Sequence, residues 1–472
     1  MREQDIYLIA AFLIYIGVLA YSVYSSPRKD KNNFEDYTRG KGAYSFFVIA
    51  IVMAVTMVGP ADALALSQNG LKYGLIWAVF PIGAALSQFV TGTFFAKRIK
   101  DNFPNINTIG DIFTQKCSKS SSFAAGFIAF IQAIAFSGVL ILAGGQVLET
   151  FTGLRKELGM IITALIVGGY TSFRGMLAVM KTDIVQGFFM GSLLLVLIIT
   201  AAMLTFNTTT NFWDDVFIKP AFRQDYDVKL ILTMFFGYFL GELLLPTYCI
   251  RASVAKDSNA ASKGFKLASL ILICWYILIT YSGSLGQYIN SENRSANDEL
   301  IILDVIRYFT HQHTVIYNIF GAFSFVVFIS LIHSTFDSFL NNGAVSFSKD
   351  MLGKLVKLTK NQELWVAKQA TIAISVLGLI IAIWQNDLID ILFIGYTVWV
   401  PTILASLLWI LLNKNNKLSS KSFWIGLIFG VLTWYIFEHV VQSFIPAILI
   451  GLVLNYLVIL VSQKYFTTQI NN

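Results

Sequence analysis

Charged residues are scarce in this chain. Asp, Glu, Lys and Arg make up 13% of its 472 residues, whereas 56% are hydrophobic. A soluble domain carries about 25% charged residues, and a soluble core stops growing near ~250–300 residues. This composition excludes a cytosolic enzyme, a nucleic-acid-binding protein and a secreted disulfide scaffold, and it predicts a polytopic membrane protein.

Cysteine and histidine are also rare, with three and four residues respectively. The cysteines form no CxxC pair and no paired spacing, so neither a disulfide framework nor a zinc site is predicted. No GxxxxGK[ST] phosphate-binding loop occurs, so the chain has no motif for ATP-driven transport. We therefore expect no cofactor.

Long apolar stretches fill most of the chain. A helix that spans a membrane needs about 20 mostly apolar residues. On that criterion thirteen spans are predicted, at 6–26, 44–68, 73–96, 122–149, 158–172, 180–204, 229–249, 266–288, 315–348, 365–385, 388–412, 423–440 and 443–463. No small-residue cleavage site follows the first, so we expect a retained helix and not a signal peptide.

The basic residues are distributed unevenly between the segments that join these spans. Lys and Arg concentrate on the cytoplasmic side of membrane proteins. Most of the 34 fall on that side if the N-terminus is outside and the C-terminus is cytoplasmic. We therefore predict this orientation in the plasma membrane, specifically a bacterial inner membrane. The net charge of +7 then reflects topology and anionic lipid, not a nucleic-acid partner.

Two spans carry helix-breaking residues near their middle. Gly59 and Pro60 interrupt the second span, and the seventh contains Gly237, Gly241 and Pro246. These spans are five helices apart, so they cross the membrane in opposite directions. Paired interrupted helices in two inverted repeats indicate the binding site of a transporter. The alternative is that Gly and Pro, which are common in membrane helices, merely kink them.

Three acidic residues fall within or at the ends of spans. Asp62 follows the first break, Glu242 lies in the seventh span, and Asp183 opens the sixth beside Lys181. A charge at the bilayer centre costs at least ~2.5–3.5 kcal/mol, so such residues are candidates for function. Asp62, with or without Glu242, would pair with an amine or ammonium group of a solute, or Asp62 only caps a half-helix. Asp183 with Lys181 could form a simple interfacial ion pair.

The ninth span carries a dense polar stripe. Ser334, Asp337 and Asn341 share one helical face, and Thr335 and Ser338 share an adjoining one. Hydroxyl and carbonyl oxygens are hard ligands that suit an alkali cation. The alternative is that Ser and Thr join neighbouring helices by ordinary hydrogen bonds.

The sequence at these sites resembles the solute:sodium symporter family, which includes the sodium/proline, sodium/galactose and choline transporters. Three stretches carry the similarity, at 170–186 (YTSFRGMLAVMKTDIVQ), 248–257 (YCIRASVAKD) and 333–350 (HSTFDS through FSKD). Gly59-Pro60-Ala61-Asp62-Ala63 in the second span is most similar to the choline-transporter branch. Where that branch places aromatic residues around an ammonium group, this chain has Ala135 or Phe136, and Leu245.

The resemblance implies an all-α polytopic membrane protein whose LeuT-type core consists of two inverted five-helix repeats. The implied units are an N-terminal extra helix and loop at 1–43, the first repeat at 44–204, an extracellular loop at 205–228, the second repeat at 229–412, and two C-terminal helices at 413–472.

The resemblance also implies a sodium site between spans two and nine. Its implied ligands are the main-chain oxygens of Ile49, Val52 and Leu331 and the hydroxyls of Ser334 and Thr335. Asp183 matches the acid on the family's sodium exit path. The residues expected to contact the solute are Gly59, Pro60, Asp62 and Glu242.

We therefore interpret the chain as a sodium-coupled secondary symporter, not an enzyme, that imports a small organic solute by alternating access. Sodium, the solute and the bilayer are the expected partners, with no nucleic acid and no obligate protein partner. Two alternatives stay open: a membrane-embedded acyltransferase with His333 as general base, and a non-transporting sensor on the same scaffold. A lone histidine is more often hydrogen-bonded in packing than catalytic, and no signalling domain accompanies the spans.

Overall fold

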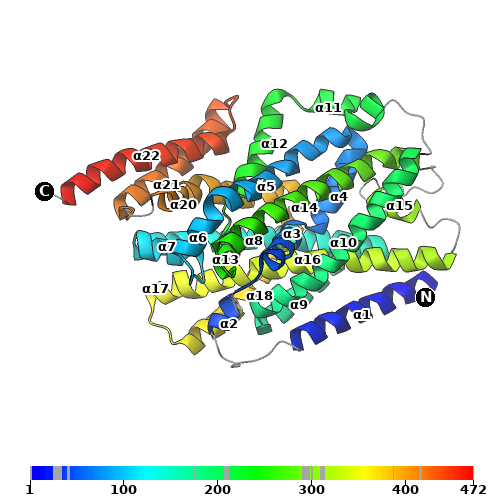
Figure 1. The fold of residues 1–472 in the computed structure, drawn as a ribbon, viewed down its shortest axis with the longest axis horizontal. Helices are drawn as coiled ribbons and strands as arrows, with labels where there is room; N and C mark the ends of the chain where they lie inside the picture. Colours follow the sequence, from blue (N-terminus) through cyan, green and yellow to red (C-terminus); the bar gives the residue numbers. More distant parts are fainter. Residues whose placement is uncertain are drawn as a thin grey trace.

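The computed structural model describes residues 3–24, 34–39, 43–174, 176–206, 212–289, 298, 301–308, 314–385, 387–413 and 417–470. Helices make up nearly all of this part of the chain (Figure 1). Across the same residues no strand forms, and one isolated β-bridge joins Tyr44 to Ala255. The predicted all-α class is confirmed.

The α-helices are α1 (Glu3–Tyr24), α2 (Phe34–Arg39), α3 (Phe46–Met57), α4 (Pro60–Tyr73), α5 (Val79–Val90), α6 (Ala96–Asn102), α7 (Ile109–Lys116), α8 (Lys119–Thr152), α9 (Lys156–Arg174), α10 (Met176–Phe206), α11 (Pro220–Asp225), α12 (Val228–Gly241), α13 (Pro246–Val254), α14 (Ser258–Leu285), α15 (Ile301–Tyr308), α16 (Thr314–Ser346), α17 (Gly353–Leu355), α18 (Lys360–Trp384), α19 (Leu388–Trp399), α20 (Ala405–Leu412), α21 (Ser420–Tyr435) and α22 (Ala447–Ile470). Short 3₁₀ turns occupy Leu75–Ala78 and Gly286–Tyr288. Turns of π-helix occupy Thr91–Phe95, Phe212–Phe217, Phe347–Leu352, Val400–Leu404 and Ile436–Val441.

Nine of the described helices are long and apolar enough to cross a membrane, or ten if the bent pair α12–α13 is one span. The predicted number of thirteen is therefore not confirmed. The first, second and fifth predicted spans fall short of this criterion. The first holds a shorter apolar helix at Ile6–Tyr21, and the second is divided after Met57.

Both predicted interruptions are breaks and not kinks. Between α3 and α4, Val58 is extended (φ −94°, ψ 96°), and α4 begins at Pro60. Because proline has no N–H, the carbonyl of Thr56 lacks its helical donor. Between α12 and α13, whose axes differ by 42°, Leu244 adopts φ +56°. Such backbone costs about 1–3 kcal/mol and persists where the surrounding structure enforces it, often at functional sites.

The helices pack in two groups that meet at the breaks. In the first, α3 and α4 lie against α14, and α12 lies against α5. In the second, α8, α9, α16 and α18 pack against one another. α16 also contacts α3, α4 and α13, which places the polar stripe beside both breaks. The two chain ends lie at opposite ends of the bundle (Figure 1).

α4 and α14 cross at two glycines. A Cβ on Gly283 would lie 2.0 Å from the carbonyl oxygen of Ser67, and one on Gly70 would lie 2.2 Å from that of Thr280. Small residues at such crossings let membrane helices approach closely. The position of α4, and with it the first break, therefore depends on these two glycines.

Residues 212–227 fold over the end of α4. The ammonium group of Lys219 donates to the Leu71 carbonyl at 2.7 Å. Asp225 accepts hydrogen bonds from Lys72 at 3.1 Å and from the Tyr73 hydroxyl at 2.9 Å, and these bonds hold the pKa of Asp225 below its usual range. α11 thus covers this end of the bundle.

At the end of the bundle away from α11, backbone hydrogen bonds join the two broken helices. The Tyr44 N–H donates to the Val254 carbonyl at 3.2 Å, and the Lys256 N–H donates to the Tyr44 carbonyl at 2.7 Å. These two bonds connect the start of α3 to the end of α13.

Candidate functional site

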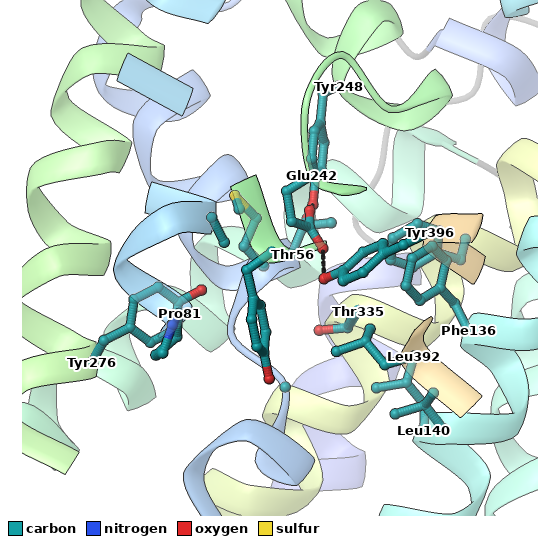
Figure 2. A pocket seen from close by; sticks show the side chains of 16 residues that line it. Thr56, Pro81, Phe136, Leu140, Glu242, Tyr248, Tyr276, Thr335, Leu392 and Tyr396 are labelled. Atoms are coloured by element: carbon teal, nitrogen blue, oxygen red, sulfur yellow. Dashed lines mark hydrogen bonds between the residues drawn. The ribbon is translucent and has the colours of Figure 1, made fainter. Parts of the chain in front are cut away.

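A cavity of about 50 Å³ lies between the two breaks (Figure 2). Gly59 and Glu242 line it from the breaks themselves. Aromatic side chains supply much of the remaining wall, namely Phe136, Tyr238, Tyr248, Tyr276, Phe339 and Tyr396. A water needs roughly 10–15 Å³, so only a few would fit. At this volume the cavity is too small for an organic molecule of more than a few heavy atoms.

Glu242 follows α12 directly and is held by two phenol groups. Its carboxylate accepts hydrogen bonds from the Tyr396 hydroxyl at 2.7 Å and from the Tyr248 hydroxyl. Figure 2 shows the carboxylate between these two side chains. A Cβ on Gly241 would lie 2.2 Å from the Tyr396 ring, so the glycine lets that ring reach Glu242. Glu242 is 8% exposed and forms no ion pair with any described residue.

A buried ionic cluster lies where α3, α10, α13 and α16 meet. The Arg251 guanidinium lies 3.2 Å from the Asp183 carboxylate, and both side chains are fully buried. The same Arg251 nitrogen donates to the hydroxyls of Thr56 at 2.9 Å and Ser338 at 2.7 Å. The Ser334 hydroxyl donates to the other Asp183 oxygen at 2.5 Å. One guanidinium therefore joins four helices.

This environment decides between the alternatives for Asp183. An interfacial ion pair would leave the carboxylate exposed at the end of its helix, whereas it is 0% exposed. The interfacial interpretation is therefore wrong, because Asp183 pairs with Arg251 in the protein interior.

Of the three predicted ligands from the ninth span, Thr335 and Leu331 contact each other, and Ser334 bonds to Asp183. The Thr335 hydroxyl donates to the Leu331 carbonyl at 3.1 Å and lies 3.4 Å from the Val55 carbonyl on α3. Val55 belongs to the last turn of α3, where the helical hydrogen-bond ladder ends. Ile49 precedes Val55 by six residues, roughly 9 Å along the helix axis. The α3 oxygen next to Thr335 is thus that of Val55, three residues beyond the predicted Val52.

Asp337 and His333 occupy the same helix on neighbouring faces. Asp337 is fully buried and accepts a hydrogen bond from the Tyr170 hydroxyl at 2.9 Å. His333 Nδ1 lies 3.1 Å from the Tyr15 hydroxyl on α1, to which the Gln186 amide also donates at 3.3 Å. His333 is therefore a hydrogen-bonded packing residue that ties α1 to α16.

Two predicted solute contacts, Pro60 and Asp62, have side chains that lie outside the described part of the chain. The backbone places Asp62 third in α4 and Gly59 directly before its first residue. An acid in a first helical turn is favoured by the helix dipole.

A second, more polar cavity of about 180 Å³ lies further along α4. Gln68, Asn69, Gln146 and Asp387 line it from α4, α8 and the start of α19. Gln68 follows Pro60 by eight residues, roughly 12 Å along the helix. The two cavities therefore lie at different depths along α4.

Several site residues could not be recognised from the sequence. Tyr396 carries no local signal, since it reaches Glu242 from a helix 154 positions away. Arg251 did carry one, because an arginine at the end of an apolar span needs a buried or interfacial partner. No group of three or more His, Cys, Asp or Glu that could hold a metal ion occurs among the described residues.

Comparison with known proteins gives a family match over most of the chain. The model of the sodium:solute symporter family matches residues 37–415. The sodium/pantothenate symporter of Haemophilus influenzae is 24% identical over 375 residues, covering 75% of this chain and 74% of its own. Sodium/proline symporter 2 of Staphylococcus saprophyticus is 21% identical over 440 residues, covering 89% and 84%. Similarity to the choline-transporter branch stays a prediction.

Two solved structures share the fold. A Na⁺-coupled sialic acid symporter, solved in a substrate-bound outward-open state, superposes with a TM-score of 0.77 at 15% identity, over 97% of both chains. Mhp1, a nucleobase-cation-symport-1 family transporter in a closed conformation, superposes with a TM-score of 0.63 at 11% identity, over 94% of this chain and 97% of its own. The LeuT-type core of two inverted repeats is confirmed.

Proposed function

The chain belongs to the sodium:solute symporter family, and from that premise we propose where its sodium and its solute bind. The family consists of sodium-coupled transporters, so the acyltransferase and sensor alternatives are set aside. The protein is an integral membrane symporter. Sodium as its own coupling ion, the import of a small organic solute, and the sites below are the proposal.

Sodium would bind where the middle of α16 faces the end of α3. The proposed ligands are the carbonyls of Val55 and Leu331 and the hydroxyls of Ser334 and Thr335, with Val55 in place of Ile49 and Val52. The observation that carries this site is the Thr335 hydroxyl beside the Val55 carbonyl. Unpaired carbonyls at the end of a half-helix are the groups that coordinate sodium in transporters with broken helices.

The charges around this site favour a cation. Asp183, Asp337 and Arg251 are all fully buried, so two acidic side chains share one guanidinium, and the cluster carries one negative charge when both acids are ionised. A buried charge without a partner is costly. One sodium ion at Ser334 would cancel it.

Solute would bind in the cavity at Glu242, one wall of which belongs to the sodium site. Thr335 lines the cavity and contacts Val55, while Thr56 lines it and accepts a hydrogen bond from Arg251. Sodium binding would therefore set the shape of the solute cavity. Each sodium entering through a 100 mV potential supplies ~2.3 kcal/mol for accumulation.

The proposed orientation places the N-terminus outside and the C-terminus in the cytoplasm of a bacterial cell. The linked ends of α3 and α13 then face the cytoplasm, and α11 faces outward. Asp183, hydrogen-bonded to Ser334, is placed to receive sodium as it leaves inward. The repeat boundaries at 44–204 and 229–412 belong to the same proposal.

A double variant, Ser334→Ala with Thr335→Ala, tests the sodium site without knowledge of the solute. Purified wild-type protein should unfold at a higher temperature in sodium than in equal potassium, because a bound ligand at 100 times its Kd adds about 2.7 kcal/mol. The double variant should lose this difference, together with sodium-driven uptake in proteoliposomes.

A matched control removes two hydroxyls that bond only to their own helix. The Ser192 hydroxyl donates to the Phe188 carbonyl at 2.9 Å, and the Thr397 hydroxyl donates to the Ile394 carbonyl at 3.1 Å. Ser192→Ala with Thr397→Ala should keep the full sodium effect. An undiminished sodium effect in the Ser334/Thr335 variant would remove the assignment.

A further inference from the structure

The solute cavity contains one acidic side chain and no basic one among its described lining residues. Glu242 is buried there, and none of the described residues that line the cavity is Lys, Arg or His. Its hydrogen-bond donors, Tyr248 and Tyr396, are neutral phenols that orient the carboxylate without cancelling its charge. Burial of a carboxylate without a counter-charge is costly, so the cavity is electrostatically incomplete.

The nearby guanidinium does not complete it. Arg251 lies on the half-helix that follows Glu242, but it is bonded to Asp183, Thr56 and Ser338. That cluster already has more carboxylates than bases, and the proposed sodium ion balances it. A bound solute is thus the remaining source of a positive group that could pair with Glu242.

The walls of the cavity suit the same kind of occupant. Phe136 stacks on Phe339 with ring centroids 4.3 Å apart, and Tyr396 lies edge-on to Phe136 at 5.9 Å. Tyr238 adds a further ring 6.2 Å from Tyr396. Aromatic faces attract ammonium groups, and the attraction grows when the site excludes water.

We propose that the transported solute is an organic cation, an amine or quaternary ammonium compound whose positive group pairs with Glu242 between these rings. This inference rests on the proposed transport function and adds the solute class to it. The relatives are named for pantothenate, proline and sialic acid, so a cationic solute is not carried over from them.

Matched probes separate charge from shape. The full-length protein in sodium would be heated with small amines from methylammonium to choline, with neutral isosteres such as 3,3-dimethyl-1-butanol for choline, and with carboxylates of similar size. At least one amine should raise the unfolding temperature, and its neutral isostere should not. The inference is overturned if no amine binds, or if neutral molecules or carboxylates bind as well as amines.

Variants at Glu242 locate the charge. Glu242→Gln keeps an oxygen acceptor for one phenol and offers an amide donor to the oxygen of the other, and it should weaken binding of the stabilising amine at least tenfold, or ~1.4 kcal/mol. Glu242→Asp and Tyr396→Phe keep the carboxylate and should weaken it less. Unchanged amine affinity in Glu242→Gln would place the cation elsewhere and refute the inference.

The two proposals fail differently. Sodium-driven uptake of a neutral or anionic solute would leave the transport function intact and remove only the cationic class. If sodium changes neither the stability of the wild-type protein nor its uptake activity, the sodium proposal itself is refuted.

Discussion

The buried charges around Arg251 predict that two neutralising substitutions differ in cost. Arg251→Gln leaves Asp183 and Asp337 buried with no cation between them. Asp183→Asn leaves Arg251 with Asp337 nearby and with its bonds to Thr56 and Ser338 intact. With both acids ionised, the first variant carries two uncompensated charges and the second carries none.

The magnitudes follow from complete burial, since both members of the pair are 0% exposed and solvent does not screen them. Removing one partner of a buried pair costs about 3–5 kcal/mol when the other charge is left uncompensated. We expect that loss for Arg251→Gln. For Asp183→Asn we expect about 1.5–3 kcal/mol, which corresponds to one hydrogen bond to a charged group.

Thermal unfolding in detergent, followed by tryptophan fluorescence in sodium-free potassium buffer, gives the test. The unfolding temperature should fall in the order wild type, Asp183→Asn, Arg251→Gln, and the double variant should lie above Arg251→Gln. As a control, Arg155→Gln breaks the exposed pair with Glu157 and should change the free energy of unfolding by less than about 0.5 kcal/mol. Equal losses for the two single variants would refute the charge count.

Three further substitutions test single contacts. Gly241→Ala should displace the Tyr396 ring and cost about 1–3 kcal/mol, measured by unfolding, whereas Gly191→Ala, with nothing within 4 Å of its Cβ, should be neutral. Tyr15→Phe removes the hydrogen bond to His333, which precedes Ser334 on α16. It should lower the free energy of unfolding by about 1–3 kcal/mol and raise the half-saturating sodium concentration in uptake assays. An unchanged unfolding curve would contradict the first expectation. Asp62→Asn should leave solute affinity within about twofold, because the ammonium group is assigned to Glu242 and the change removes only an interaction with the helix dipole worth about 0.3–1 kcal/mol; a tenfold loss would assign the ammonium group to Asp62.

Features that depend on neighbouring residues could be predicted from the sequence. Gly59 and Pro60 interrupt their helix through their own chemistry, as does Pro246 in the second break. The helical spacing of Ser334 and Thr335 placed both hydroxyls on adjoining faces, which the structure turns toward α3 and α10.

Features that depend on the register between helices could not be predicted from the sequence. Asp183 finds Arg251 at a separation of 68 residues. Packing decides which turn of α3 faces Thr335, and the contact that forms there is with the carbonyl of Val55, one turn beyond the predicted Val52. The count of thirteen spans was not confirmed, because the first, second and fifth predicted spans contain helices that do not meet the length and hydropathy criterion for a membrane span. Tertiary contacts stabilise such short or broken helices in the folded protein.

The backbone bridge between Tyr44 and Ala255 has a consequence for how motion in this protein can be observed. It connects the start of α3 to the end of α13, so we expect these two segments to move together. A pair of spin labels across the bridge should then report one constant distance through the cycle, and a chemical crosslink there should leave turnover intact. Reporter pairs must instead join one of these segments to the second group of helices, for example to α18, where their separation changes with each exchange between the two faces.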